Sequence, residues 1–199
     1  MKRYGFTLAE VLITLGIIGV VSAMVIPTFT QSTQNAKIGP KLAKAVAGFE
    51  QATKACLNDA ESDSLIGSGI GTGANFMGNI SHHLKGSIND DTFMAADGTS
   101  YTIINRFSDT TGTFPHLTPV NTQIRVDING DAAPNTDARD RFYFQLMDDG
   151  SLRPWGGSWE AEANRWNGDR GRCRRNVKPD DTMYCAGHVM ENGLKVEYK

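Results

Sequence analysis

The sequence lacks the short motifs by which many enzymes and nucleotide-binding proteins are identified. Its 199 residues contain no Gly-Lys pair, which excludes a P-loop, and no Gly-x-Ser-x-Gly nucleophile motif. The three cysteines form no C-x-x-C pair and have no zinc-finger spacing to a histidine. The glycine-rich stretch 67–73 fails the dinucleotide-binding pattern, because Thr72 stands where that pattern needs glycine. We therefore do not expect an enzyme.

An excess of charge of one sign is also lacking. The chain has 20 basic and 22 acidic side chains, a formal net charge of -2. It therefore shows neither the basic excess typical of nucleic-acid-binding proteins nor an acidic tail. With 40% hydrophobic residues, the chain can bury one globular core. The apolar residues are unevenly spread, however, because a long run of them lies near the N-terminus.

The first 26 residues divide into a short basic segment and a long apolar one. Lys2 and Arg3 precede the run from Phe6 to Ile26, in which Glu10 is the only charged residue. A helix of that length spans about 30 Å, which matches the hydrocarbon core of a bilayer. The positive-inside rule places the basic segment in the cytoplasm and the remainder of the chain across the membrane.

Two ordinary explanations of such a segment leave Glu10 unexplained. A secretory signal has a shorter apolar stretch and a small-x-small cleavage site, for which Ser22-Ala23-Met24 is a poor match. A plain membrane anchor gains nothing from a carboxylate in hydrocarbon, where a charge is costly. We therefore expect Glu10 to have a function of its own.

The stretch Gly5-Phe6-Thr7-Leu8-Ala9-Glu10 resembles the prepilin peptidase site of type IV pilins and type II secretion pseudopilins. In that family the chain is cut after the glycine, the new N-terminal phenylalanine is methylated, and the glutamate is the fifth mature residue. The resemblance therefore implies cleavage after Gly5, methylation of Phe6 and a role for Glu10. It extends to Pro27, since the family often has proline at that place.

Elementary electrostatics agrees with a role in assembly. Cleavage leaves a positive amine on Phe6, and in a packed filament core this amine and the Glu10 carboxylate would each be a buried charge without a partner. If Glu10 of one subunit pairs with the Phe6 amine of a neighbour, each charge satisfies the other. Such a pair fixes the stagger between subunits more than it adds stability. We therefore assign Phe6 and Glu10 to assembly.

The helix is expected to continue well beyond the apolar run. Apolar residues recur at roughly helical spacing from Ala36 to Leu57, with an interruption at Gly39-Pro40. Pro27 and Pro40 each predict a kink or a loosening, because proline removes a backbone donor and clashes with the preceding turn. Residues 61–78, which are rich in Ser, Gly and Asp, predict a loop.

The second half of the chain predicts a small antiparallel sheet. β-Branched and aromatic runs favour strands at 101–104, 123–128 and 141–146, with a returning strand at 151–153. The fold class is therefore α+β, a long N-terminal helix packed on a small antiparallel β-sheet head, which is also the pilin fold that the resemblance implies. The expected parts are a leader at 1–5, a transmembrane and assembly helix at 6–27, an amphipathic continuation of that helix at 28–60, and a globular α+β head at 61–199.

Two of the three cysteines, Cys173 and Cys185, lie close together in a polar segment. Outside the cytoplasm, a local disulfide between them is the natural interpretation, and it would stabilise the fold by about 2–3 kcal/mol on the chain-entropy model. The alternative is two free thiols. Cys56 is left over, and the sequence does not reveal whether it is buried, free or paired.

Oxygen-bearing side chains alternate just after the run 123–128, as in the first half of an EF-hand-like loop. The full EF-hand pattern is not met, because Ala132 and Ala138 stand where glycine and glutamate are required. Calcium sites in the head are known in the pseudopilin family, and we predict a calcium site here. A polar turn without an ion is the alternative. The six candidate ligands are Asp127, Asn129, Asp131, Asn135, Asp137 and Asp140.

Together these features predict a structural subunit of a type II secretion pseudopilus or a type IV pilus. Its partners would be a prepilin peptidase, other pilin or pseudopilin subunits and a membrane assembly platform; nucleic acid is not expected. The chain would reside in the bacterial inner membrane as a single-pass protein with its head outside the cytoplasm, and then in a periplasmic or cell-surface filament. The alternative is a minor pilin whose head binds DNA or a surface ligand, and its surface would be the Arg-rich stretch 170–178 or the tryptophans nearby.

Overall fold

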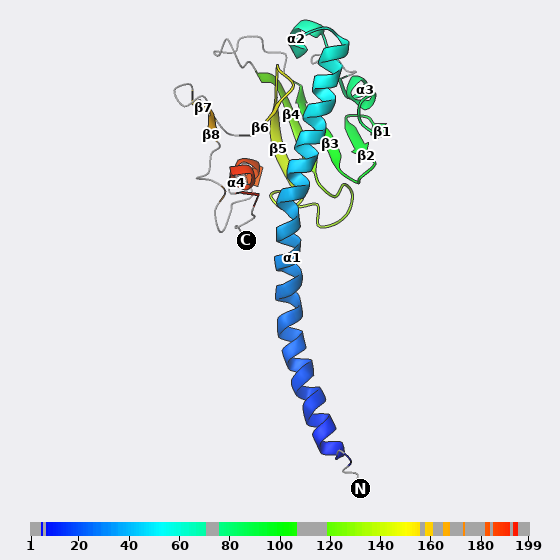
Figure 1. Cartoon of the computed structure of the whole chain (residues 1–199), viewed down its shortest axis with the longest axis vertical. Helices are drawn as coiled ribbons and strands as arrows, with labels where there is room; N and C mark the ends of the chain where they lie inside the picture. The colour runs from blue at the N-terminus through cyan, green and yellow to red at the C-terminus, as the bar shows by residue number, and fades with distance from the viewer. Residues whose placement is uncertain are drawn as a thin grey trace. The chain divides into compact units, whose positions relative to one another are not determined.

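The computed structural model describes residues 5, 7–70, 76–106, 119–155, 158–160, 165–167, 173, 182–183, 185–191 and 193–194 (Figure 1). The chain divides into two compact units, Met1–Lys37 and Ile38–Lys199, and we call the second unit the head. Helix α1, Leu8–Asp59, contributes to both units and is helical through both Pro27 and Pro40. The predicted class, α+β with a long N-terminal helix, is confirmed.

The first part of α1, Leu8–Val25, is apolar and exposed. Among the described residues, Leu8–Val25 is the one segment that is long and apolar enough to cross a membrane, with a mean hydropathy of 2.3 and none of it buried in the structure. So large an apolar surface is not stable facing water and marks a contact with lipid or protein. The large side chains exposed along it are Leu8, Val11, Leu12, Ile13, Leu15, Ile17, Ile18, Val20, Val21, Met24 and Val25.

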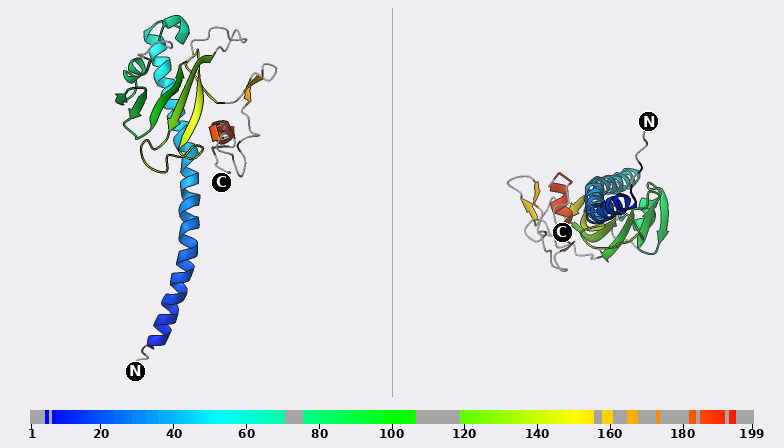
Figure 2. Two further views of the ribbon diagram at one scale, coloured as in Figure 1. Left: turned by 180° about the vertical axis from the view of Figure 1, so that it is seen from behind. Right: turned by 90° about the horizontal axis from the view of Figure 1, so that it is seen from below.

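In the head, α1 lies against one face of the sheet (Figure 2). Leu42, Val46 and Phe49 are buried at helical spacing, so one side of this part of the helix faces the core. The predicted interruption at Gly39-Pro40 is wrong, since α1 is continuous there. Gly39 has a packing role instead. A Cβ atom at Gly39 would lie 1.8 Å from the backbone oxygen of Leu194, so only glycine lets the C-terminal turn approach so closely.

Six antiparallel strands form the main sheet in the order β1-β2-β3-β4-β5-β6. The three central strands confirm the predicted runs, and along β5 the buried side chains of Phe142, Phe144 and Leu146 alternate with half-buried ones. The strand bounds are β1 Gly86–Asn89, β2 Thr92–Ala95, β3 Ser100–Arg106, β4 Pro119–Asp127, β5 Arg141–Met147 and β6 Leu152–Pro154.

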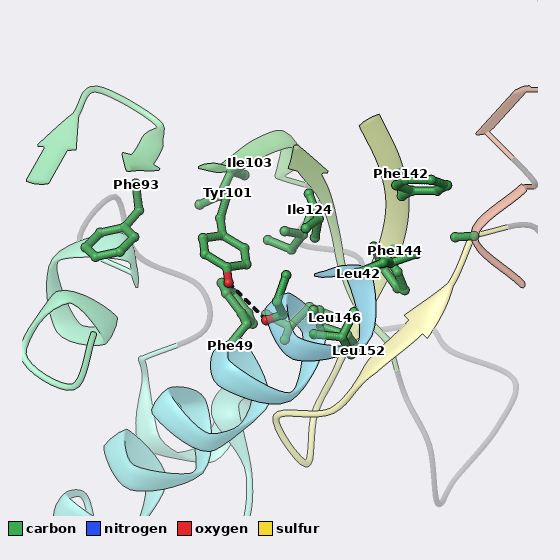
Figure 3. Packing of buried hydrophobic residues seen from close by; sticks show 14 of the residues in the cluster. Leu42, Phe49, Phe93, Tyr101, Ile103, Ile124, Phe142, Phe144, Leu146 and Leu152 are labelled. Carbon is green, nitrogen blue, oxygen red and sulfur yellow. Dashed lines mark hydrogen bonds between the residues drawn. The ribbon is translucent and has the colours of Figure 1, made fainter. Parts of the chain in front are cut away.

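The core lies between α1 and the sheet (Figure 3). Phe49 of α1 is fully buried, and its ring lies 5.1 Å from that of Tyr101 on β3 and 6.3 Å from that of Phe76. The Tyr101 hydroxyl donates a hydrogen bond of 2.9 Å to the Ala45 backbone oxygen. This bond gives the buried hydroxyl a partner and ties the middle of the sheet to the helix.

Tyr101 predicts how the stability of the head depends on alkaline pH. Burial, with a smaller contribution from the Asp97 charge, raises the pKa of Tyr101 above its usual value of 10. The folded head therefore retains a proton that the unfolded chain loses, so its stability is fully present below pH 10 and is lost as the pH rises further. Urea unfolding at pH 9 and 11 should show a decline in the wild type that is smaller in Tyr101→Phe. Equal declines would contradict this assignment.

The predicted loop at 61–78 is wrong in part, because two short helices lie in or across it. Helix α2, Leu65–Ser68, is capped by Ser64, whose hydroxyl accepts a bond from the Gly67 amide. Helix α3, Phe76–Ser81, buries Phe76, Met77 and Ile80 in the core. Burial of these three side chains stabilises α3. The helix was not predicted because the sequence before it is rich in polar residues and glycine.

The described C-terminal part adds a small hairpin and one helix to the head. Strands β7, Ser158–Glu160, and β8, Arg165–Asn167, pair with each other. Helix α4, Cys185–Glu191, lies near β5 and β6. The structure contains the predicted disulfide between Cys173 and Cys185, with both residues fully buried. Cys56 is a buried free thiol whose Sγ donates to the Asn79 backbone oxygen.

Candidate functional site

The start of α1 brings Thr7 and Glu10 together. Thr7 precedes the first helical residue, and its backbone N–H and its hydroxyl both donate to Glu10 Oε2 at 2.8 Å. The Glu10 amide in turn donates to Thr7 Oγ1 at 3.3 Å. This reciprocal arrangement is a capping box, which satisfies amides that the first helical turn leaves unpaired.

The capping box leaves part of the Glu10 carboxylate available. Both Thr7 donors use Oε2, and an ionised carboxylate offers about four acceptor positions on its two oxygens. Glu10 can therefore cap its own helix and still accept an N–H donor from another group. Sequence reasoning identified Glu10 and missed Thr7, although Thr7-Leu8-Ala9-Glu10 is a readable capping-box pattern.

Of the two residues at the expected cleavage point, the structure describes Gly5 but not Phe6. Gly5 is exposed, and a Cβ atom placed on it would meet nothing within 4 Å. Its backbone is therefore not enclosed by the rest of the described chain. Phe6 lies outside the described residues.

The predicted calcium ligands lie on one loop between β4 and β5, and two of them are buried carboxylates. Asp127 accepts from the Asn129 amide at 3.2 Å and from Arg141 Nε at 3.1 Å. Burial raises the pKa of Asp127, and the nearby Asp140 charge adds to this, so these two donors do not fully compensate the carboxylate. The arginine partner was missed from the sequence.

The remaining four predicted ligands are also distributed around this loop. Asp140 accepts from the amides of Asn135 and Thr136 at 2.6 and 2.5 Å, and Asp137 accepts from the Tyr143 hydroxyl at 2.9 Å. Asp131 is exposed, and its backbone oxygen accepts from Asn135 Nδ2 at 3.1 Å. Local polar bonds of this kind are what an Asx-rich turn makes without an ion.

The fit of this loop to a metal ion rests on its amide oxygens. Within the part of the chain that the structure describes, no three His, Cys, Asp or Glu side chains gather closely enough to hold a metal ion. Asn129 Oδ1 and Asn135 Oδ1 are buried and have no hydrogen-bond partner. Orphaned amide oxygens on the same loop as the under-compensated Asp127 carboxylate are suitable ligands for a hard cation such as Ca²⁺. The donor chemistry therefore fits calcium, although Arg141 would compete for Asp127.

Comparison with known proteins identifies one region of the chain. A family model described as the prokaryotic N-terminal methylation motif matches residues 1–26. No curated protein and no solved structure matches the chain. The match covers Gly5, Thr7 and Glu10 together with the exposed apolar helix, so the resemblance seen in the sequence is confirmed for the N-terminal signal, which is of the type IV pilin-like prepilin kind.

Proposed function

Because the chain carries a type IV pilin-like prepilin signal, we propose that it is a structural subunit of a type II secretion pseudopilus or a type IV pilus. The observation that carries this proposal is the single charge in the exposed apolar helix, Glu10, held by Thr7 at the first turn. A residue of this kind is costly in hydrocarbon and is retained where it has a partner. The motif favours a structural subunit over an enzyme.

Assembly follows from the chemistry of the N-terminal unit. A prepilin peptidase cuts after Gly5, and the amine of Phe6 becomes a second charge beside the apolar helix. Glu10 Oε1, which neither Thr7 donor uses, accepts a hydrogen bond from the Phe6 amine of a neighbouring subunit. The apolar side chains leave the lipid and pack against those of neighbouring helices, so the helix exchanges one apolar environment for another.

The proposed function also implies the partners and the cellular location of the chain. Before assembly, Leu8–Val25 crosses the inner membrane once, with the head outside the cytoplasm, and a membrane assembly platform and other pilin or pseudopilin subunits receive it. After assembly the chain belongs to a periplasmic or cell-surface filament. The buried disulfide between Cys173 and Cys185 suits an oxidising compartment.

The test is to isolate filaments from cells that produce the full chain. Filaments sheared from the surface, or recovered from the periplasm of a secretion-competent strain, should contain the chain as a stoichiometric component by mass spectrometry. In a strain without prepilin peptidase, the chain should stay in the membrane fraction. Filaments that lack the chain in the strain with the peptidase would refute the proposed function.

The alternative function is a minor pilin that binds DNA or a surface ligand. One of its predicted binding surfaces, the Arg-rich stretch 170–178, lies outside the described residues except for Cys173, which is bonded to Cys185. Of the tryptophans that form the other, Trp159 and Trp166 are paired across β7 and β8, a pairing that does not test ligand binding. This function therefore stays a prediction.

We also propose that the loop between β4 and β5 binds Ca²⁺ in the head. The expected ligands are the carboxylates of Asp127 and Asp140 with the amide oxygens of Asn129 and Asn135. Binding to the folded form should raise the thermal midpoint by several degrees at a calcium concentration of about 100 times Kd.

Asn135→Leu, which removes one orphaned oxygen and leaves both carboxylates in place, should abolish this calcium-dependent shift. Asp149→Asn, which removes an exposed carboxylate outside the loop, is the matched control and should retain it. A thermal midpoint that does not respond to calcium or to chelation in the wild type would show that the loop is a polar turn without an ion.

A further inference from the structure

An open groove of about 410 Å³ lies on the head, beside the exposed face of α1. Helix α1 contributes Lys44, Ala47 and Gly48 to one wall, and the opposite side includes Lys85, Ala95 and Ala96. Four small residues, Ala47, Gly48, Ala95 and Ala96, leave room for a turn of another chain, and the larger residues Gln51, Leu84, Asp97 and Tyr101 complete the lining.

Gly48 lacks a side chain that would extend into this groove. Packing within the head does not require glycine at this position. A Cβ atom at Gly48 would meet nothing within 4 Å. Glycine in a helix interior is destabilising relative to alanine, because it loses more conformational freedom on folding. The glycine at 39 is explained by the close approach of Leu194, whereas at 48 the space is open.

The charged residues that line the groove are two lysines and Asp97, so its rim carries a small net positive charge. Lys44 and Lys85 line it and are exposed, and Lys41 is exposed one turn before Lys44 on the same face of α1. Lys44 pairs with Asp97 at 2.8 Å, yet the Lys44 side chain remains 72% exposed. Asp97 offsets one of these three lysines, and the remaining positive charge favours a partner that carries carboxylates.

The head carries such a group at the other end of the same helix. The turn between α1 and α2 reads Asp59-Ala60-Glu61-Ser62-Asp63, and its three acidic residues are exposed. Asp148 accepts hydrogen bonds from Ser64 Oγ at 2.7 Å and from the Ile66 amide at 2.9 Å, which places the exposed Asp149 near this turn. Asp149 Oδ1 accepts from the Ser151 amide and hydroxyl, so Oδ2 is the oxygen that these bonds leave unused. We call Asp59, Glu61, Asp63 and Asp149 the acidic corner.

Within one molecule the acidic corner is far from the Lys44 end of the groove, although Asp59 pairs with His83 Nε2 at 3.0 Å, two residues before the groove residue Lys85. Lys44 and Asp59 lie 15 residues apart on one continuous helix, which separates them by about 22 Å at 1.5 Å per residue. Two copies displaced along the helix axis can bring these surfaces together. Because the two surfaces differ, each copy keeps one of them free for a further copy, and such a contact propagates as an open polymer.

We propose that the groove of one subunit receives the acidic corner of a second copy of this chain. The small residues Ala60 and Ser62 enter beside Ala47 and Gly48, and the carboxylates on either side of them meet Lys44 and Lys85. This inference rests on the proposed function and deepens it, since it names the head contact that a filament subunit makes with its neighbour. Charge complementarity sets which surfaces meet.

Cysteine crosslinking in the full-length chain tests this contact directly. The variant with both Lys44→Cys and Glu61→Cys, oxidised in membranes and in sheared filaments, should give a ladder of disulfide-linked multimers. Each single variant should give no ladder. The native cysteines should not interfere, because Cys56 is buried and Cys173 is bonded to Cys185. If the double variant yields only monomer, the inference is wrong.

Charge reversal tests the chemistry of the contact. Lys44→Glu with Lys85→Glu should lower the fraction of the chain that sediments with filaments about ten-fold, because like charges then face each other. Adding Glu61→Lys and Asp63→Lys to the same chain should restore that fraction. Lys54→Glu, a single charge reversal on α1 outside the groove, is the control for a charge reversal on this helix and should have little effect. Failure of the reversed acids to restore assembly would count against the pairing.

A variant that fills the groove distinguishes an effect on docking from an effect on folding. Gly48→Leu adds a side chain where the head has open space, so its thermal midpoint should not fall, while crosslinking of the Lys44→Cys, Glu61→Cys chain should be lost. Undiminished crosslinking would overturn the inference. A different result, the absence of the chain from filaments, would refute the proposed function. A chain that is processed and present in filaments without the Lys44–Glu61 crosslink refutes the head contact alone.

Discussion

Replacing Phe49 with alanine is expected to lower the free energy of unfolding of the head by about 3–5 kcal/mol. The side chain is fully buried between α1 and the sheet, with its ring against those of Tyr101 and Phe76. Its loss removes apolar contacts and leaves a cavity that the neighbouring strands fill only partly. A small domain is stable by roughly 5–15 kcal/mol in all, so this variant should be close to unfolding at 37 °C. Urea unfolding followed by circular dichroism measures the difference.

The matched control for Phe49→Ala lies on the opposite face of the same helix. Gln51 is exposed, and Gln51→Ala should change the unfolding free energy by no more than about 0.5 kcal/mol. Similar effects in the two variants would contradict the assignment of Phe49 to the centre of the core.

Replacing Glu10 with leucine is expected to abolish filament assembly without affecting the fold of the head. The substitution leaves the Phe6 amine of a neighbour buried without a counter-charge, and breaking a buried pair in this way costs about 3–5 kcal/mol per contact. That cost recurs at every subunit of a filament. The sedimented filament fraction, with membrane insertion and N-terminal processing measured in parallel, gives the readout.

Two further variants separate the charge of Glu10 from its capping role. Glu10→Gln retains an oxygen that can accept from Thr7 but removes the charge, and we expect it to fail in assembly as Glu10→Leu does. Thr7→Ala removes the capping hydroxyl at a cost of about 1 kcal/mol to the helix and should still assemble. If Glu10→Leu builds normal filaments, the assembly role of the carboxylate is wrong.

The sequence predicts those strands whose β-branched and aromatic residues are also the residues buried in the core. Strands β3, β4 and β5 are rich in β-branched and aromatic residues, and these residues are buried where the sheet faces α1. Strand β1 was missed because its four residues, Gly86–Asn89, are all exposed and include only one apolar side chain. Pairing with β2, rather than burial, stabilises β1, and a register of that kind cannot be read from composition.

The same distinction applies to the functional residues. Glu10 was predictable, since a carboxylate within an apolar run stands out in any sequence, and its partner Thr7 lies within the same local pattern. The pairing of Asp127 with Arg141 was not, because these residues are 14 positions apart and meet only through the register of β4 and β5. The groove and the acidic corner depend likewise on how α1, the β2–β3 turn and α2 pack in the head.

The central claim is that this chain is processed and assembled as a pilin-type subunit, and the most direct test is the mass of its mature N-terminus. The protein should be recovered from membranes and from sheared filaments, and its N-terminal peptide mapped by mass spectrometry. The account predicts a chain that begins at Phe6, with a methylated amine, in both fractions. A chain that begins at Met1 would leave a simple membrane anchor, and one that begins near Pro27 would be a secreted protein. Either result would contradict the account.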